Sequence, residues 1–227
     1  MPLNVFQDDG WFQRMPAARQ TTLLAAGHIR PFKDQQRIYR LGDPPNGLYG
    51  LVSGDVRLIS YPAAGRQLLV LRLKPGGWFG ELSMIDGGPR PQDAVSFGPS
   101  KVLHITSGAF ERLYGHDTEI FADVARLVCQ RQRAAVQYAG MTVTLPVKMR
   151  LSHLLLAAVD TNPGSPLERT VSLTQSEIAA TLGVSRQTAN KLLGALERTV
   201  AVSRGYGLIT VLNPTRLRNL SKSDRRV

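Results

Sequence analysis

Four glycines surround the stretch WFGELSMIDGGPRPQDAV, residues 78–95; they are Gly77, Gly80, Gly87 and Gly88. Glycine brings backbone amides close to a ligand, so a segment of this kind could bind an anion such as a phosphate. The charges of the stretch conflict with this interpretation, because Arg90 is its only cation and Asp86 and Asp93 are carboxylates. The segment is therefore either a phosphate site or a loop that keeps the shape of one.

A second segment, TQSEIAATLGVSRQTANKLLGAL at residues 174–196, has the spacing of a helix-turn-helix. Thr174 and Glu177 match a capping box for one helix, and Ser185 can cap the next. Ala179 is small where two helices cross closely, and Gly183 allows the positive φ of a tight turn. The shared core is expected to consist of Ile178, Leu182, Ala189 and Leu192. A plain helical hairpin shares one or two of these features, so the full set favours a DNA-binding motif.

The second helix of this motif would expose the side chains that contact DNA, namely Ser185, Arg186, Gln187, Asn190 and Lys191. The planar fork of Arg186 matches O6 and N7 of guanine, and the amide of Gln187 or Asn190 matches adenine. Lys191 can contact phosphate or guanine. The chemistry predicted for this helix is the recognition of base edges in a DNA groove.

The charge of the chain agrees with a nucleic-acid partner. The 227 residues include 28 Lys and Arg against 17 Asp and Glu, a net charge of +11. Residues 142–227 hold 12 basic and 5 acidic residues, whereas residues 1–141 hold 16 and 12. A solvated basic surface would explain this composition about as well, and the helix-turn-helix pattern decides between the two.

The residues that catalysis or metal binding would need are scattered. They are His28, His104, His116, His153 and the single cysteine, Cys129. No histidine has a spaced partner, and one cysteine cannot build an iron–sulfur cluster or an intrachain disulfide. No P-loop, G-x-S-x-G or H-E-x-x-H pattern occurs, so the chain is not expected to be an enzyme. A cupin-like metal-dependent enzyme is the alternative from another class, and it would need a cluster of histidines and carboxylates.

Short β-type runs separated by turns occupy residues 20–107. Glycine-containing turns follow one another too closely there for crossover helices. In one run, Val56, Leu58 and Ser60 alternate with Arg57 and Ile59. This pattern predicts a compact antiparallel β-roll or barrel.

One long helix is predicted from about Asp117 to Gly140. Residues at alternating steps of four and three form a coiled-coil type of stripe: Ile120, Val124, Leu127, Arg131, Ala134, Tyr138 and Met141. This stripe could pack on the roll of its own chain, but its length favours a homodimer. Gly140 and Pro146 are expected to break the helix and mark a hinge.

The rest of the chain has the order of a winged helix. An apolar helix at Val147–Val159 is followed by a turn at NPGSP, a strand near TVSL, the two helices described above, and a hairpin that turns at Gly205, Tyr206 and Gly207. The predicted α+β architecture is a β-roll sensor domain at 1–116, a dimerisation helix at 117–141, a hinge at 142–146 and a DNA-binding domain at 147–227.

From about residue 20 to 213 the chain resembles the CRP/FNR family of bacterial transcription regulators. The resemblance rests on LGDPPNGLYGLVSGDVRL, GRQLLVLRLKPGGWFGEL, a long helix ending in YAG, and LTQSEIAATLGVSRQTANKLLGALE, in that order. It implies a cyclic-nucleotide-binding-type antiparallel β-roll, a long dimerisation helix and a C-terminal winged helix-turn-helix. It also implies a homodimer on a near-palindromic site in double-stranded DNA and contact with RNA polymerase.

The resemblance also implies roles for residues in the roll. In family members that bind cyclic AMP, a Gly-Glu-Leu cassette ends in an arginine and a serine that hold the phosphate, and the glutamate accepts a ribose hydroxyl. Gly80, Glu81 and Leu82 match the beginning of this cassette. Counting back from Ala94 puts Gln92 and Asp93 at its end, where a carboxylate would repel a phosphate.

Arg90 lies two to three residues before the expected arginine position, between Pro89 and Pro91. The two prolines could re-route the loop so that Arg90 reaches inward. Counting from Gly140, the helix positions that offer hydroxyls to adenine fall on Ala135 and Val136, which donate nothing. Glu81 could also pair with Arg131 of the helix instead of meeting a ribose.

These departures imply a DNA-binding regulator whose roll senses another effector than cyclic AMP, or none. A cyclic-nucleotide-responsive regulator is the alternative within the same class. The sequence has no signal peptide pattern and no apolar stretch near the roughly 20 residues that span a bilayer, so a cytoplasmic protein without membrane contact is expected.

Overall fold

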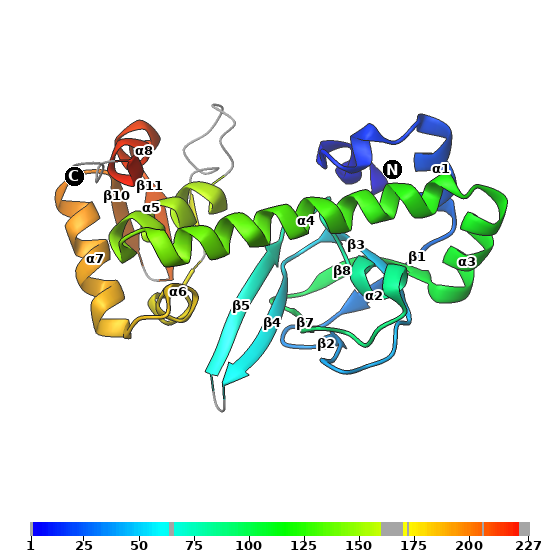
Figure 1. Ribbon diagram of the computed structural model, residues 1–227, viewed down its shortest axis with the longest axis horizontal. Helices are drawn as coiled ribbons and strands as arrows, with labels where there is room; N and C mark the ends of the chain where they lie inside the picture. The colour runs from blue at the N-terminus through cyan, green and yellow to red at the C-terminus, as the bar shows by residue number, and fades with distance from the viewer. Residues whose placement is uncertain (1, 64–65, 160–169, 172, 206, 223–227) are drawn as a thin grey trace. The chain divides into compact units, whose positions relative to one another are not determined.

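Figure 1 shows the computed structural model, which describes residues 2–63, 66–159, 170–171, 173–205 and 207–222. The chain divides into two compact units, residues 1–134 and 135–227, and each is described by itself. The first unit contains a β-roll and the N-terminal helices. The second contains short helices and a small sheet.

Two antiparallel sheets of four strands form the roll, in the orders β1-β8-β3-β6 and β2-β7-β4-β5. The strands are β1 (His28–Phe32), β2 (Arg37–Tyr39), β3 (Gly47–Ser53), β4 (Val56–Ala63), β5 (Arg66–Leu73), β6 (Trp78–Phe79), β7 (Asp93–Ser96) and β8 (Ser100–Thr106). Tight turns join them, as at Gly54, where φ is +97° and a side-chain carbon would lie 2.3 Å from Oγ of Ser100. The predicted antiparallel roll is confirmed.

The first half of strand β4, residues 56–59, is buried on both faces, whereas Tyr61 further along is 39% exposed. Val56 and Leu58 pack in the core between the sheets. Arg57, which alternates with these two residues, is 7% exposed, and its Cζ atom lies 3.8 Å from the ring centroid of Phe97. An aromatic neighbour therefore covers a side chain whose charge suggested exposure.

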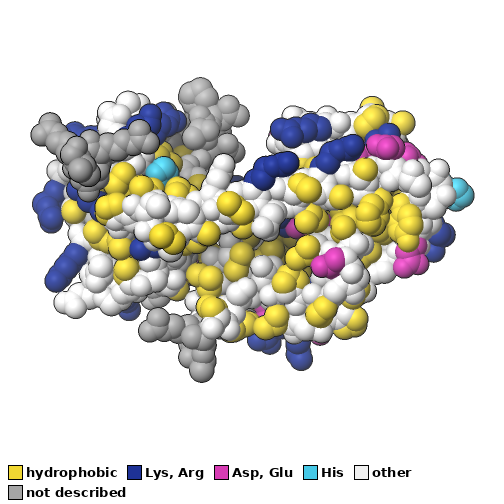
Figure 2. Space-filling view, viewed as in Figure 1, with side chains coloured by type: hydrophobic (Ala, Val, Ile, Leu, Met, Phe, Trp, Pro, Cys, Tyr) yellow, Lys and Arg dark blue, Asp and Glu magenta, His cyan; other side chains and the backbone are white. Residues whose placement is uncertain are grey.

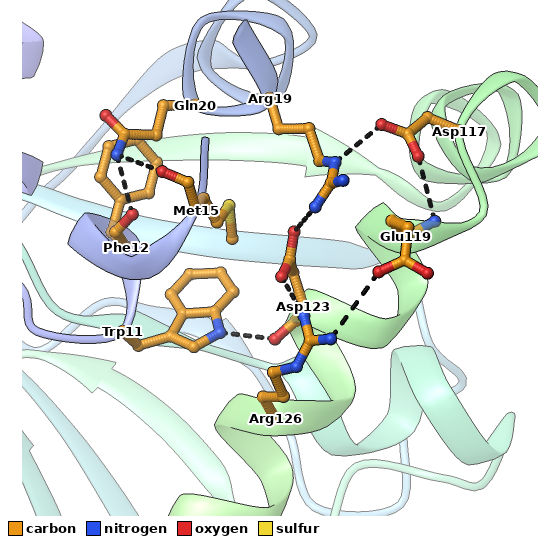
Figure 3. Close-up of polar contacts among 9 residues, drawn as sticks. All are labelled: Trp11, Phe12, Met15, Arg19, Gln20, Asp117, Glu119, Asp123 and Arg126. Atoms are coloured by element: carbon orange, nitrogen blue, oxygen red, sulfur yellow. Dashed lines mark hydrogen bonds and ion pairs between the residues drawn. The ribbon is translucent and has the colours of Figure 1, made fainter. Parts of the chain in front are cut away.

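A second core of the first unit joins the N-terminal helices to later ones. Its elements are η1 (Pro2–Asp8), η2 (Phe12–Arg14), α1 (Ala17–Ala25), α3 (Ser107–His116) and α4 (Glu119–Thr144). Trp11 donates its indole N–H to the backbone O of Asp123 at 2.5 Å (Figure 3). Arg19 pairs with the carboxylates of Asp117 and Asp123, each at 2.8 Å, and Arg126 also contacts Asp123. These contacts fasten the N-terminal segment to the beginning of α4.

The stripe predicted as a dimer seam on α4 divides into two parts. Ile120, Val124 and Leu127 are 2%, 0% and 5% exposed, and they lie in the core of their own unit. The expectation that they face a partner copy is therefore wrong, because the N-terminal helices and α3 already cover them. Tyr138, further along the same stripe, is 40% exposed.

Helix α4 runs to Thr144, beyond the predicted end at Gly140. A glycine inside a helix costs only about 1 kcal/mol relative to alanine, so it does not by itself end one. Thr142 and Thr144 donate their hydroxyls to the backbone O of Tyr138 and Gly140, one turn earlier. The helix break comes at Pro146, where the sequence also predicted one.

The second unit has the predicted winged-helix order. Its elements are α5 (Val147–Ala158), β9 (Thr170–Val171), α6 (Gln175–Leu182), α7 (Arg186–Arg198), β10 (Val202–Gly205), β11 (Leu208–Val211) and α8 (Pro214–Lys222). The strands pair antiparallel in the order β10-β11-β9. The predicted turn at NPGSP and the turn residue Tyr206 lie outside the described residues. Helix α8, which packs on α5, had no counterpart in the prediction.

Candidate functional site

Local interactions set the geometry of the helix-turn-helix. The capping box of α6 is complete: the N–H of Glu177 donates to Oγ1 of Thr174 at 3.2 Å, and the N–H of Thr174 donates to the Glu177 carboxylate at 2.7 Å. Gly183 ends α6 with φ of +69°. Ser185 caps α7, because its Oγ accepts the N–H of Thr188 at 3.1 Å. The chain therefore turns sharply from α6 into α7, as the motif requires.

The core between these two helices is buried as predicted, with one change. Ile178, Leu182 and Ala189 are 0%, 2% and 0% exposed. Leu193 is also 0% exposed, whereas Leu192, the predicted core residue, is half-buried. Both positions lie near the apolar stripe of a helix, and the step of four from Ala189 points more directly into the core here.

Three of the predicted DNA-contacting side chains, Arg186, Gln187 and Lys191, are exposed on α7. Figure 2 shows Lys and Arg side chains on the surface over this helix. Asn190 is half-buried, and its Oδ1 has no hydrogen-bond partner among the described residues. Ser185 is exposed, but its hydroxyl serves the cap and lies 2.9 Å from Oγ1 of Thr188. The exposed donors for base edges or phosphates are thus Arg186, Gln187 and Lys191.

An ion pair that the sequence analysis missed joins α7 to the β10–β11 hairpin, the wing. Arg204 of β10 donates its Nε–H to Oε2 of Glu197 at 2.7 Å, and its backbone N–H donates to Oε1 at 3.1 Å. The hydrogen bonds from Arg204 hold the pKa of the Glu197 carboxyl below its ordinary value. The two residues of this pair lie on either side of a turn, one in a helix and one in a strand. Their spacing therefore follows neither the helical nor the strand period, and no pattern in the sequence predicts the pair.

In the first unit, the side chain of Arg90 lies inside the roll and is 1% exposed. Its Nη1–H donates to the backbone O of Gly80 at 2.7 Å, and Nη2–H donates to Oδ1 of Asn46 at 2.7 Å and O of Gly47 at 2.6 Å. Its Cζ lies 4.5 Å from the ring centroid of Tyr39. Its Nε has no partner within the described part of the chain. The loop with two prolines thus turns Arg90 inward, the alternative that the sequence left open.

Glu81 is the first residue of α2 (Glu81–Asp86) and is 5% exposed. It directly follows Gly80, whose carbonyl accepts a hydrogen bond from Arg90. Arg131 of α4 donates an Nη1–H to Oε1 of Glu81 at 2.6 Å and also contacts the backbone O of Trp78. The second oxygen, Oε2, is buried with no partner among the residues described. Glu81 therefore pairs with Arg131, as expected for one of its two possible roles, and keeps one oxygen open.

The carboxylate of Asp93 is turned to other partners than Arg90. Its Oδ2 accepts from Nε of Arg37 at 3.1 Å and from the hydroxyl of Tyr61 at 2.8 Å, and its Oδ1 accepts from the N–H of Leu41 at 2.7 Å. Burial raises the pKa of this carboxyl, but the three hydrogen bonds together bring it below the ordinary value. Both oxygens of Asp93 therefore have partners within the roll, on β2, on β4 and in the loop after β2.

The remaining pocket candidates have little polar chemistry. Gln92 is half-buried, and Leu82 is 39% exposed. Ala135 and Val136 belong to the second unit and are exposed, and neither side chain carries a hydrogen-bonding group.

Asn46, which the sequence analysis missed, links Arg90 to a histidine. Its Oδ1 accepts from Arg90 and also from the hydroxyl of Tyr49 at 2.8 Å, and its backbone O lies 3.0 Å from Nε2 of His104. The rings of His104 and Tyr49 stack with centroids 4.5 Å apart. Burial lowers the pKa of His104, and a neutral ring with its proton on Nε2 suits this contact. The turn LGDPPNG marks the place of Asn46 in the sequence, but not its partners.

Among the described residues, no group of three histidine, cysteine, aspartate or glutamate side chains could hold a metal ion. In the same set, no helix is both long enough and apolar enough to cross a membrane. Cys129 is exposed on α4.

Comparison with known proteins covers both units. A family model described as "Cyclic nucleotide-binding domain" matches residues 29–117, and one described as "Crp-like helix-turn-helix domain" matches residues 149–220. The "CRP-like cAMP-activated global transcriptional regulator" of Mycobacterium tuberculosis is 30% identical over 159 residues, which are 69% of this chain and 71% of that protein. The chain belongs to the CRP/FNR family of transcription regulators.

Solved structures agree with this membership. A CRP/FNR family transcriptional regulator from Thermus thermophilus has a TM-score of 0.70 at 26% identity, over 86% of this chain and 99% of that one. The structure of FixK2 from Bradyrhizobium japonicum has a TM-score of 0.74 at 20% identity, over 86% and 96%, which supports the fold.

This CRP/FNR regulator is a DNA-binding transcription regulator with a cyclic-nucleotide-binding-type roll. The two family models cover the roll and the helix-turn-helix of this chain. Neither model describes a cupin-like enzyme, and three of the matching relatives are named as transcriptional regulators.

Proposed function

We propose that this regulator binds a near-palindromic site in double-stranded DNA as a homodimer, with α7 of each copy in the major groove. The observation that carries the proposal is the exposed row of Arg186, Gln187 and Lys191 on a helix whose start is fixed by the Ser185 cap. Two-fold related helices read half-sites whose centres lie about 34–36 Å apart, one turn of DNA. In this proposal the chain has four parts. They are an effector-sensing domain at 1–116, a dimerisation helix at 117–141, a hinge at 142–146 and a DNA-binding domain at 147–227.

Each exposed side chain has a proposed role. Arg186 donates two hydrogen bonds to guanine, and Gln187 pairs with adenine. Lys191 contacts a phosphate or guanine, Asn190 contributes its amide, and Ser185 orients the first turn of α7 through its cap. Base contacts give the sequence preference, and phosphate contacts give most of the affinity.

The surface proposed for dimerisation is another face of α4, whose side chains are mostly small or apolar and all at least partly exposed. Its residues follow one another at steps of four and three, as in a coiled coil: Phe121, Ala125, Val128, Gln132, Ala135 and Ala139. Phe121 is 37% exposed, and the small alanines permit a second helix to approach closely. Arg126 and Arg133 fall on another side of the helix, which leaves this face uncharged.

The DNA proposal is tested by selecting binding sites from a random pool of duplexes with the purified full chain. We expect a near palindrome with half-site centres about one helical turn apart. Recovery of unrelated sequences, or of single half-sites without symmetry, would contradict the proposal.

For the roll, we propose an effector that is an anion, recognised without selection for adenine. Arg90 supports the anion, because its described acceptors are two carbonyls and an amide, and its Nε stays open. The open Oε2 of Glu81 fits a ligand hydroxyl. At the helix positions that the family resemblance assigns to adenine recognition, Ala135 and Val136 carry no donor, which supports the lack of selection.

Cyclic AMP is the first ligand to test, because the Mycobacterium tuberculosis relative is named as activated by it. Calorimetry should show that cyclic AMP and cyclic GMP bind with similar affinity, and DNA binding should change little when cyclic AMP is added. Micromolar binding that strongly prefers adenine would support the cyclic-nucleotide-responsive alternative instead.

As a transcription regulator this protein is further proposed to contact RNA polymerase in the cytoplasm. The family membership supports this role. A co-purification of polymerase with the regulator on promoter DNA tests it.

A further inference from the structure

Two arginine side chains from different elements converge over Gly194 of α7. A side-chain carbon on Gly194 would lie 3.8 Å from Nη1 of Arg198 and 3.9 Å from Nη2 of Arg204. Arg198 belongs to the last turn of α7, and Arg204 belongs to β10 of the wing. The absence of a side chain at Gly194 thus leaves a bare patch of helix between two guanidinium groups.

Glu197 determines where one of these guanidinium groups lies. Its Oε2 accepts from Nε of Arg204 at 2.7 Å and from Nη2 at 2.6 Å, and its Oε1 accepts the backbone N–H of Arg204. The carboxylate balances one of the two positive charges. Arg198 is exposed and has no hydrogen-bond or ion-pair partner in the described part of the chain, so the group keeps a net positive charge.

These residues continue the face of α7 that carries Gln187 and Lys191. Gln187, Lys191, Gly194 and Arg198 are separated by steps of four, three and four, which keeps them on one side of a helix. If the first half of α7 meets base edges, its last turns meet the DNA backbone where the helix leaves the groove. A phosphate there would face the bare patch at Gly194.

We propose that Gly194, Arg198 and Arg204 form a binding site for one phosphate of the DNA backbone. The two guanidinium groups donate to the phosphate oxygens, and Gly194 lets the phosphate approach the helix closely. Glu197 is a positioning residue that holds Arg204, and with it the wing, beside α7. The inference rests on the proposed function, because it takes the exposed side of α7 as the DNA-facing side.

The test measures DNA binding by fluorescence anisotropy over a series of salt concentrations, on the selected site and on a random duplex. Arg198→Ala removes a phosphate contact, so it should weaken both DNAs by about the same factor, roughly tenfold. It should also lower the slope of log affinity against log salt by about 1. The fold of the variant should be intact, since Arg198 is exposed.

A second variant separates phosphate binding from folding. In Gly194→Ala, the new methyl group would sit at ordinary contact distance from both arginines, and alanine favours a helix over glycine. The melting temperature should therefore rise while DNA affinity falls. Gly115→Ala on α3 is the matched control: it is also helical, with nothing within 4 Å of the added carbon, and should raise the melting temperature without changing DNA affinity.

Arg186→Ala, measured in parallel, distinguishes failure of this inference from failure of the proposed function. Wild-type affinity and salt slope in Arg198→Ala, or wild-type affinity in Gly194→Ala, overturns the phosphate site. If Arg186→Ala still relaxes the sequence preference in that case, the proposed DNA contacts of the first half of α7 are retained and only the phosphate site is abandoned. If Arg186→Ala also has no effect, the DNA-facing side of α7 is wrong and both proposals fail.

Discussion

The charged residues of the roll and those of α7 are used in opposite ways. Arg90, Glu81 and Asp93 are at most 5% exposed and are held by partners distant in the sequence. Arg186 and Lys191 are exposed and have no partners among the described residues. The charged side chains of the roll therefore help to hold the fold together. Those of α7 are available to bind a partner, which we propose to be DNA. The predictions below test this difference.

The largest expected effect separates the two faces of α4. Leu127→Glu puts an unpaired charge into the core of the first unit, so the free energy of unfolding should fall by about 4 kcal/mol. Ala139→Glu, its control at an exposed position of the proposed dimer face, should leave folding nearly unchanged and shift a dimer toward monomer. Chemical denaturation and light scattering measure the two effects. A folded, monomeric Leu127→Glu would mean that the buried stripe is the dimer seam after all.

The next effect compares the same substitution at a buried and an exposed arginine. Arg90→Met leaves the carbonyls of Gly80 and Gly47 without their donor, so it should lower the free energy of unfolding by about 2–4 kcal/mol. Arg186→Met should change it by less than about 0.5 kcal/mol, since that side chain is exposed. Urea denaturation of both variants checks this. Equal stability losses would remove the contrast between the roll and α7.

The smallest effect concerns pH. The pKa of Asp93 is lowered in the folded state, so its hydrogen bonds stabilise the fold above the ordinary value of about 3.9 and lose this effect as the pH falls through the folded pKa. Asp93→Asn should flatten the acid side of the stability curve. Asp8→Asn, which removes an exposed carboxylate, is the control. An unchanged acid limb in Asp93→Asn would show that Asp93 gains nothing from its partners.

The sequence predicts the helix-turn-helix well because its determinants are local. Thr174, Glu177, Gly183 and Ser185 act within a few residues of themselves, so their spacing is enough to predict the structure. The same holds for the antiparallel roll, whose short strands and turns have a regular pattern. Family resemblance then assigns both parts to one kind of regulator.

The pocket residues were harder to place, because their positions depend on contacts between distant segments. Arg90 binds Asn46, 44 residues away, and a loop with two prolines decides which side chain points inward. The stripe on α4 had two possible partners, and its spacing is the same whether it packs on its own unit or on a second copy. Sequence periodicity gives the face of a helix and not what covers it.

The most direct test of the central claim, that α7 reads DNA through exposed side chains, compares Arg186→Ala on the selected site and on random DNA. If Arg186 contacts guanine, the variant should lose about 1–3 kcal/mol on the selected site and accept other bases at one position in each half-site. Its affinity for random duplex should change much less. Equal losses on both kinds of DNA would contradict base recognition by Arg186 and reduce its role to a phosphate contact.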